Sequence, residues 1–229
     1  MEIDWNVVKP WQLFLACMQE IHECQQCGKC CRGMQGIAMT RLDRIKMAEH
    51  LGISEKEFTK KYTQPSPRKP SDRLYIPVGE DERCPFQGDH GGCTQYEGRG
   101  QVCRFYPWAS PENMELVRKG KPPMVYDRCK GQMLTYLHIL EDAENMEAPM
   151  VEAVLKSDSG KLLFLKVVDM EGRGEAYIKK RLKTLGLDDW PEPDALKALA
   201  YHYAVAFCAK FTPQAREFMR RDLRGYINR

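Results

Sequence analysis

Four cysteines stand close together in the stretch Cys24-Gln-Gln-Cys27-Gly-Lys-Cys30-Cys31. The two-residue gaps let a tight loop direct successive thiolates toward one centre, and Gly28 relieves the steric strain of the turn. Backbone N–H groups in such a turn can hydrogen-bond the sulfurs. We expect Cys24, Cys27 and Cys30 to face one centre. Because its side chain diverges from that of its neighbour Cys30, we expect Cys31 to serve a second centre or to support the first.

The overall composition is that of an ordinary globular protein. The 229 residues are 43% hydrophobic and 29% charged, which excludes wholesale disorder and a fibrous repeat. A net charge of +3 is too balanced to indicate nucleic acid. The acidic start MEIDWNVVKPW argues against a secretory signal, and no apolar run reaches the roughly 18–20 residues of a membrane helix. We therefore expect a cytoplasmic protein without membrane contact, where clustered cysteines are metal ligands rather than disulfides.

The N-terminal half reads as short helices and loops. Helices are expected over 10–23 and over 41–51, the second with Thr40 as its N-cap. A third helix, over 55–62, should begin at a capping box formed by Ser54 and Glu57. A short strand is expected in LYIPV. The segment 84–129 is rich in Gly and Pro and has little apolar periodicity, so its shape should depend on a bound centre.

The chain changes character after Cys129. Helices are expected over 130–147, over YIKKRLKTLGL, over 194–209 and over 213–227, and VEAVLKSDSGKLLFLKVVDM reads as a β-hairpin. The predicted fold class is α+β, with a loop-rich, metal-stabilised N-terminal half with short helices, plus a C-terminal β-hairpin and helices. We expect two domains: a cysteine-cluster metal-binding domain at 1–135, and an α+β extension at 136–229 packed on it.

Further cysteines carry signatures of their own: Cys84-Pro85-Phe86, Cys93-Thr94-Gln95-Tyr96-Glu97-Gly98-Arg99-Gly100, Cys103-Arg104-Phe105-Tyr106-Pro107 and Cys129-Lys130-Gly131. With the first block, they resemble the YkgJ-type cysteine-cluster family, described as zinc- or iron-chelating and marked by CxxCxxCC. The resemblance covers about residues 20–135, and Gly100 departs from it where the family favours Pro. It implies that eight cysteines hold metal, namely Cys24, Cys27, Cys30, Cys31, Cys84, Cys93, Cys103 and Cys129.

The spacing of these cysteines bears on which metal they hold. Eight cysteines divide into two Cys₄ sites, each able to hold a [4Fe–4S] cluster, and by analogy with bacterial-type ferredoxins Cys84-Pro85 could complete the first. Structural zinc usually uses two C-x₂₋₄-C knuckles, and no second knuckle follows here. This favours iron–sulfur, with zinc as the alternative. A single centre with the spare thiols supporting it also stays open.

Two main functions follow. The first is an iron–sulfur protein that transfers electrons or supplies a cluster to a redox or maturation partner. The second is a structural zinc protein whose C-terminal half binds a partner. A third hypothesis is an enzyme that uses the cluster as a Lewis acid, so the question of enzymatic activity stays open. No sequence motif identifies a catalytic residue.

Other residues have competing interpretations. Cys17 and Cys208 lie in apolar helical stretches and are expected in the core. His22 and His90, close to the cysteines, could ligate metal or take surface and capping roles. The arginines that flank Cys103 could compensate the charge of a thiolate cluster or form ordinary loop salt bridges. The basic tail 210–229 is expected to be a solvated helix face, with a nucleic-acid or partner surface as the alternative.

Overall fold

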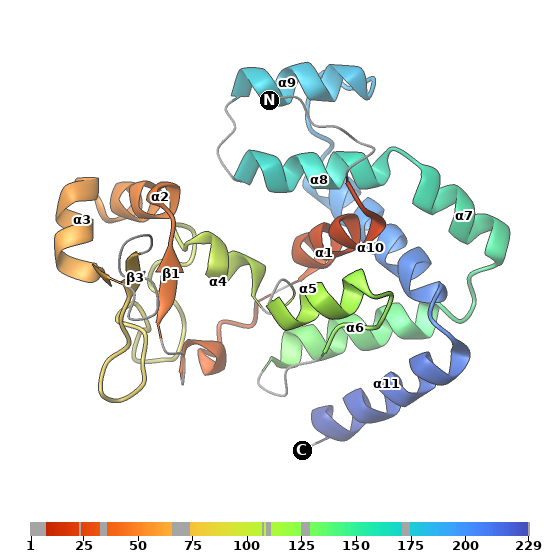
Figure 1. The fold of residues 1–229 in the computed structure, drawn as a ribbon, viewed down its shortest axis with the longest axis horizontal. Coiled ribbons are helices and arrows are strands. Elements are labelled where there is room, and N and C mark those ends of the chain that lie inside the picture. Colours follow the sequence, from red (N-terminus) through yellow and green to blue (C-terminus); the bar gives the residue numbers. More distant parts are fainter. Residues whose placement is uncertain are drawn as a thin grey trace. The chain divides into compact units, whose positions relative to one another are not determined.

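The computed structural model describes residues 8–22, 24–32, 36–65, 74–106, 108, 111–124, 129–170 and 175–228. Its contacts divide the chain into two compact units (Figure 1). The cysteine unit is Cys24–Tyr106, and the helical unit combines Met1–Glu23 with Pro107–Arg229. The chain thus leaves the helical unit, forms the cysteine unit, and returns.

A small antiparallel sheet lies in the cysteine unit. Its strands are β1 (Ile37–Met39), β2 (Gln64–Pro65) and β3 (Leu74–Ile76), in the order β1-β3-β2. The register pairs Ile37 with Ile76 and Gln64 with Tyr75. β3 confirms the strand expected in LYIPV, and the sheet makes the α+β class correct.

The described part of the cysteine unit also contains the helical segments η1 (Lys29–Cys31), α2 (Arg41–Leu51), α3 (Glu55–Tyr62) and α4 (Gln101–Phe105). The two capping predictions are confirmed, because Thr40 Oγ1 accepts from Asp43 N at 3.1 Å and Ser54 Oγ accepts from Glu57 N at 3.2 Å. Gly52 ends α2 in the left-handed conformation at φ 68°.

The cysteine unit has its own apolar core. Phe58 and Phe86 stack at its centre, with ring centroids 6.2 Å apart, and both are buried. Further buried members come from β1, α2, β3 and the loop that follows β3: Ile37, Met39, Met47, Ala48, Ile76 and Cys84. This core therefore extends into the loop segment that carries the downstream cysteines.

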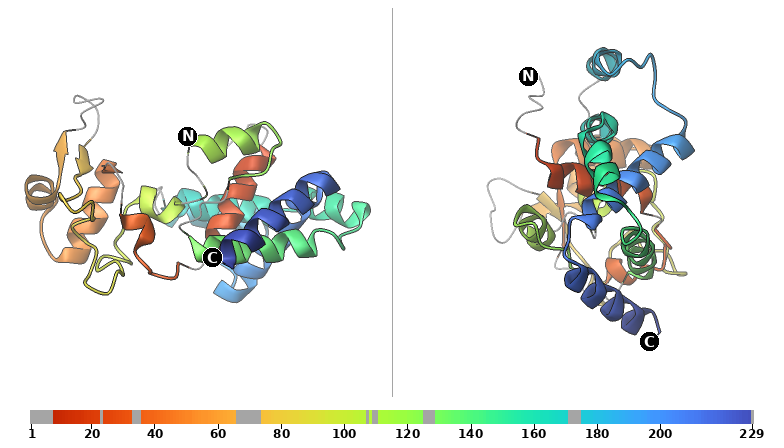
Figure 2. Two further views of the ribbon diagram at one scale, coloured as in Figure 1. Left: turned by 90° about the horizontal axis from the view of Figure 1, so that it is seen from below. Right: turned by 90° about the vertical axis from the view of Figure 1, so that its right-hand side faces the viewer.

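The helical unit consists of α1 (Pro10–Ile21), α5 (Pro111–Arg118), α6 (Lys130–Asp142), α7 (Ala148–Lys156), α8 (Ser159–Met170), α9 (Glu175–Thr184), α10 (Pro193–Ala209) and α11 (Pro213–Ile227). α1 packs on α8 and α10, and α11 packs along α6 (Figure 2). Phe14 of α1 stacks on Phe207 of α10 with centroids 4.5 Å apart. Cys17 and Cys208 are fully buried in this core, as expected, and burial raises the pKa of both thiols.

The β-hairpin prediction for 151–170 is wrong, because this stretch forms α7 and α8. Its apolar residues recur at helical spacing: Leu162, Leu163 and Leu165 are buried, and α8 packs against α1. The SDSG sequence separates two helices, and Ser157 Oγ donates to Val154 O at 2.7 Å at the end of the first. The helix expected over 130–147 ends earlier, at Asp142.

The expected domains, 1–135 and 136–229, and the compact units have different limits. α1, α5 and the start of α6 belong to the unit of the C-terminal helices, because α1 contacts α5, α8 and α10. The extent of the metal-binding domain stays a prediction, since compactness does not define which residues hold metal.

Gly160 of α8 offers a test of the packing in the helical unit. A Cβ there would lie 2.8 Å from Tyr203 Cε2 and 2.8 Å from Leu13 Cδ1, whereas a Cβ at Gly225 of α11 would meet nothing within 4 Å. We expect Gly160→Ala to lower the free energy of unfolding by about 1–2 kcal/mol through overpacking. Gly225→Ala should raise it by about 0.5–1 kcal/mol through helix propensity. Urea unfolding measures both, and equal stabilities would contradict the packing.

Candidate metal centre

The structure distributes the predicted ligands unevenly. The cysteine unit contains Cys24, Cys27, Cys30, Cys31, Cys84, Cys93 and Cys103, whereas Cys129 belongs to the helical unit. Among the nine cysteines whose side chains the structure describes, none is in a disulfide. The side chain of Cys30 lies outside the description, so its divergence from Cys31 stays a prediction.

Four predicted ligands gather around one apolar core. Cys84 is 7% exposed and forms part of it, and Cys31, Cys93 and Cys103 are half-buried and pack against it. These residues come from the CxxCxxCC block, from the turns after β3 and from α4. By contrast, Cys24 is outside this cluster and Cys27 is exposed. The fold thus brings cysteines from distant parts of the sequence into contact with one core.

Backbone contacts fix the CxxCxxCC block against the turns that follow Cys84. Cys84 N donates to Cys31 O at 3.1 Å, and the Gln87 side chain donates to Gly28 O at 3.1 Å and to Gly91 O at 3.3 Å. Gly28 has φ 69°, and a Cβ there would lie 2.0 Å from Gly91 O. The expected role of Gly28 is confirmed, and its requirement comes from the close approach of Gly91 as well as from the turn.

One sulfur already accepts a backbone hydrogen bond. Gln26 N donates to Cys24 Sγ at 3.4 Å, within the two-residue gap between Cys24 and Cys27. This is the type of N–H···S contact expected of the loop. Such bonds lower the electron density on a thiolate and are one way in which a protein tunes a bound centre.

Asp43 positions the helix that carries Cys103. Its Oδ2 accepts from Thr40 N at 2.9 Å within the capping box of α2, and its Oδ1 accepts from Gln101 N at 2.7 Å, at the first turn of α4. Asp43 is only 5% exposed. The Thr-x-x-Asp pattern indicates the first bond, but the second joins residues far apart in sequence, and the sequence analysis missed it.

Arg104 and Arg99 organise the loop before α4. Arg104 Nε donates to Arg99 O at 2.8 Å, and its guanidinium also donates to Glu97 O. The Arg99 guanidinium lies over the Tyr96 ring, 3.7 Å from its centroid. Burial, followed by the charge of Arg99, lowers the pKa of Arg104. These partners are carbonyls and a ring rather than carboxylates, and charge compensation of a cluster stays a prediction.

The donor chemistry of the cysteine unit fits a thiophilic metal. Thiolates suit zinc and iron–sulfur clusters alike, so the residues present agree with either group. In the described part of the chain, no three His, Cys, Asp or Glu side chains are close enough together to hold an ion. The grouping of the ligands therefore stays a prediction, including the expectation that Cys84 completes the first site.

The comparisons with known proteins agree with the chemistry. Residues 23–123 match the CxxCxxCC family, "Putative zinc- or iron-chelating domain". The resemblance seen in the sequence is therefore confirmed for this stretch, and the protein is a metal-binding protein. The CxxCxxCC match includes seven of the eight predicted ligands, and Cys129 lies beyond it. Neither a curated protein nor a solved structure matched the chain.

The basic tail forms α11, and several of its arginines pair with groups inside the helical unit. Arg224 pairs with Glu141 at 2.8 Å, and Arg220 pairs with Glu144 and Glu217. Arg216 donates to Ala209 O at 2.9 Å. Within the described ranges, no helix has the length and apolar character needed to cross a bilayer.

Proposed function

We propose that the chain is a cytoplasmic iron–sulfur protein that transfers electrons or supplies a cluster to a protein partner. The observation that carries this proposal is the gathering of Cys31, Cys84, Cys93 and Cys103 around one apolar core. A zinc knuckle brings its ligands together in short pairs, whereas a cluster can take single thiolates from separate loops. When bound, a [4Fe–4S] group would supply one-electron chemistry.

The chain's own residues would give the cluster a dry and ordered site. Phe58 and Phe86 keep water from the core beside Cys84, and the fixed turn at Gly28 holds the CxxCxxCC block in place. Low dielectric and backbone N–H groups are the main protein controls on the potential of such a centre. Eight cysteines leave room for a second centre.

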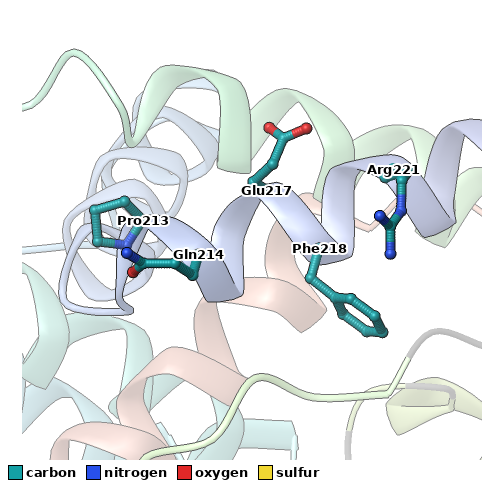
Figure 3. Close-up of a pocket in the computed structure, with 5 residues that line it drawn as sticks. All are labelled: Pro213, Gln214, Glu217, Phe218 and Arg221. Atoms are coloured by element: carbon teal, nitrogen blue, oxygen red, sulfur yellow. The ribbon is translucent and has the colours of Figure 1, made fainter.

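A structural zinc protein that binds a partner is the second candidate. It is favoured by an exposed apolar side chain on α11: Phe218 is 57% exposed, and the Arg221 guanidinium lies 5.4 Å from its ring centroid (Figure 3). Phe218 also lines a groove between α11 and the segment after α5, together with Pro123 and Tyr226. Exposed aromatic residues beside arginines are common at protein interfaces.

Metal and sulfide analysis of the protein purified without oxygen tests the proposal. We expect brown protein with broad absorption near about 400 nm, and about four irons for one cluster or about eight for two. A colourless protein with stoichiometric zinc would favour the second candidate. Cys84→Ala should lose metal, whereas Cys208→Ala should keep it and cost about 1 kcal/mol of packing. Metal-free protein with paired disulfides would refute both functions.

A further inference from the structure

Exposed apolar side chains gather at one groove of the helical unit. Among the described residues, six large apolar side chains are exposed, and three of them, Met124, Phe218 and Tyr226, line this groove. Its two walls are α11 and the segment 121–124 that follows α5, and its volume is about 520 Å³. Gathering of this kind marks a surface that another molecule covers.

The wall formed by residues 121–124 is held in a fixed position. Asn113 of α5 is fully buried, and its side chain donates to Met124 O at 3.2 Å and accepts from Met124 N at 2.6 Å. At the other end of the segment, Lys121 N donates to Leu116 O at 2.9 Å. The groove is therefore formed before a partner binds, and little loss of chain entropy opposes binding.

The groove suits a partner helix better than a partner strand. Pro122 and Pro123 have no N–H group, and both backbone groups of Met124 are bonded to Asn113, so this wall has no edge to which a strand could add. An amphipathic helix needs no backbone partners and packs along a row of side chains at helical spacing. The residues of α11 that line the groove form such a row: Ala215, Phe218, Met219, Asp222, Leu223 and Tyr226.

The cations at the groove favour an acidic partner. Lys121 lines the groove, and the Arg221 guanidinium lies 5.4 Å from the ring centroid of Phe218, in a neighbouring hollow that both residues line (Figure 3). Neither cation forms an ion pair with a described residue, whereas Arg224, also on α11, pairs with Glu141 at 2.8 Å. Opposite charges across an interface increase both the association rate and the specificity.

We propose that this groove docks an acidic, amphipathic helix of a partner protein. Phe218 is the central apolar contact, and Lys121 and Arg221 pair with acidic side chains beside the apolar stripe of the helix. Asp222 also lines the groove, so those acidic side chains lie away from it. The inference rests on the proposed function, which requires a protein partner, and it adds the docking surface and the chemistry of the docked segment.

A membrane surface fits the same groove less well. An exposed phenylalanine beside an arginine is also found where proteins bind anionic lipids. A lipid surface, however, cannot fill a groove between two walls, and Asp222 would repel its negative charge. The observations therefore favour a protein helix, and lipid binding becomes one outcome of the test.

Selection from a displayed library of helical peptides tests the docking surface, with the full chain purified without oxygen as the target. We expect the enriched sequences to carry apolar residues at i, i+3 or i+4, and i+7, flanked by Glu and Asp. A synthetic peptide of the most enriched sequence then gives a dissociation constant by fluorescence anisotropy.

Two variants and two matched controls locate the binding site of this peptide. Phe218→Ala should weaken peptide binding at least about tenfold, because the main apolar contact is lost. Met150→Ala is its control, since Met150 of α7 is 56% exposed against 57% for Phe218 and lies outside the groove. Arg221→Glu should weaken binding about fivefold, and by less at high salt. Lys180→Glu reverses an exposed charge on α9 and should bind as wild type.

The outcomes separate this inference from the proposed function. If no helical sequence is enriched, or if the peptide binds Phe218→Ala as tightly as wild type, the groove is not the docking site. Enrichment of basic or uncharged helices would overturn the acidic partner. Binding to vesicles of phosphatidylcholine and phosphatidylserine, lost in Phe218→Ala and without any enriched peptide, would also refute the inference. Zinc in place of iron would refute the proposed function and leave these peptide results unchanged.

Discussion

Gly28→Ala is expected to abolish metal loading of the cysteine unit. An alanine Cβ at this position would lie 2.0 Å from Gly91 O and 2.2 Å from the Gln87 side-chain nitrogen. Neither the CxxCxxCC block nor the turns after Cys84 can keep their position at that distance, because the nearest atom belongs to the backbone. The block should therefore move away from Cys84 and lose the hydrogen bond between Cys84 N and Cys31 O.

Gly52→Ala is the matched control for this substitution. Gly52 has φ 68°, almost the value of 69° at Gly28, but its Cβ would meet nothing within 4 Å. Both variants thus carry the same left-handed strain of about 1 kcal/mol, and only Gly28→Ala adds the collision. Metal content after reconstitution measures the difference. Normal metal content in Gly28→Ala would show that the two loops need not touch.

Asp43→Ala is expected to remove about 3 kcal/mol from the stability of the cysteine unit, because one buried carboxylate holds two helix starts. Both Thr40 N and Gln101 N would lose their acceptor. α4 is short, so its first turn has few other contacts to hold it, and Cys103 should become more reactive toward alkylating reagents. Urea unfolding of the metal-loaded full chain gives the stability, and the alkylation rate of Cys103 gives the local effect.

Glu57→Ala provides the comparison, because Glu57 has the same position in the capping box of α3. Its carboxylate accepts from Ser54 N at 2.9 Å, and hydrogen bonds from Ser54 lower its pKa. Glu57 is exposed and serves α3 alone, so its loss should have a smaller effect and should not change the reactivity of Cys103. Equal effects of the two substitutions would mean that the bond from Asp43 to Gln101 does not hold α4.

Local sequence patterns were sufficient to predict a contact where both of its residues lie in one short segment. The caps at Thr40 and Ser54, and the glycine that ends α2, each depend on residues at most four positions away. The prediction for 151–170 was wrong because runs of leucine and valine on both sides of SDSG are compatible with a hairpin as well as with two helices. Packing of α8 on α1, which the sequence does not reveal, decides between them.

The sequence predicted which types of residue form the candidate site, but not the contacts between them. The cysteine spacings indicated a metal domain, and the family match over 23–123 confirms it. The contact between Gln87 and Gly28 joins residues that are 59 positions apart, and no sequence pattern around a glutamine predicts such a long-range contact. The contact between His22 and Cys129 likewise joins residues that are 107 positions apart. Such contacts follow from tertiary structure, so spacing along the chain does not reveal them.

The route of the chain has a consequence for how the cysteine unit can vary in length. His22 and Trp108 stand just outside the two ends of the cysteine unit, and their rings are 6.3 Å apart. The helical unit therefore brings the two ends of the cysteine unit close together, and the entropy of closing a loop there rises only slowly with loop length, by about 0.6 kcal/mol for each doubling. A segment joined in this way can change in length while the helical unit keeps its own core.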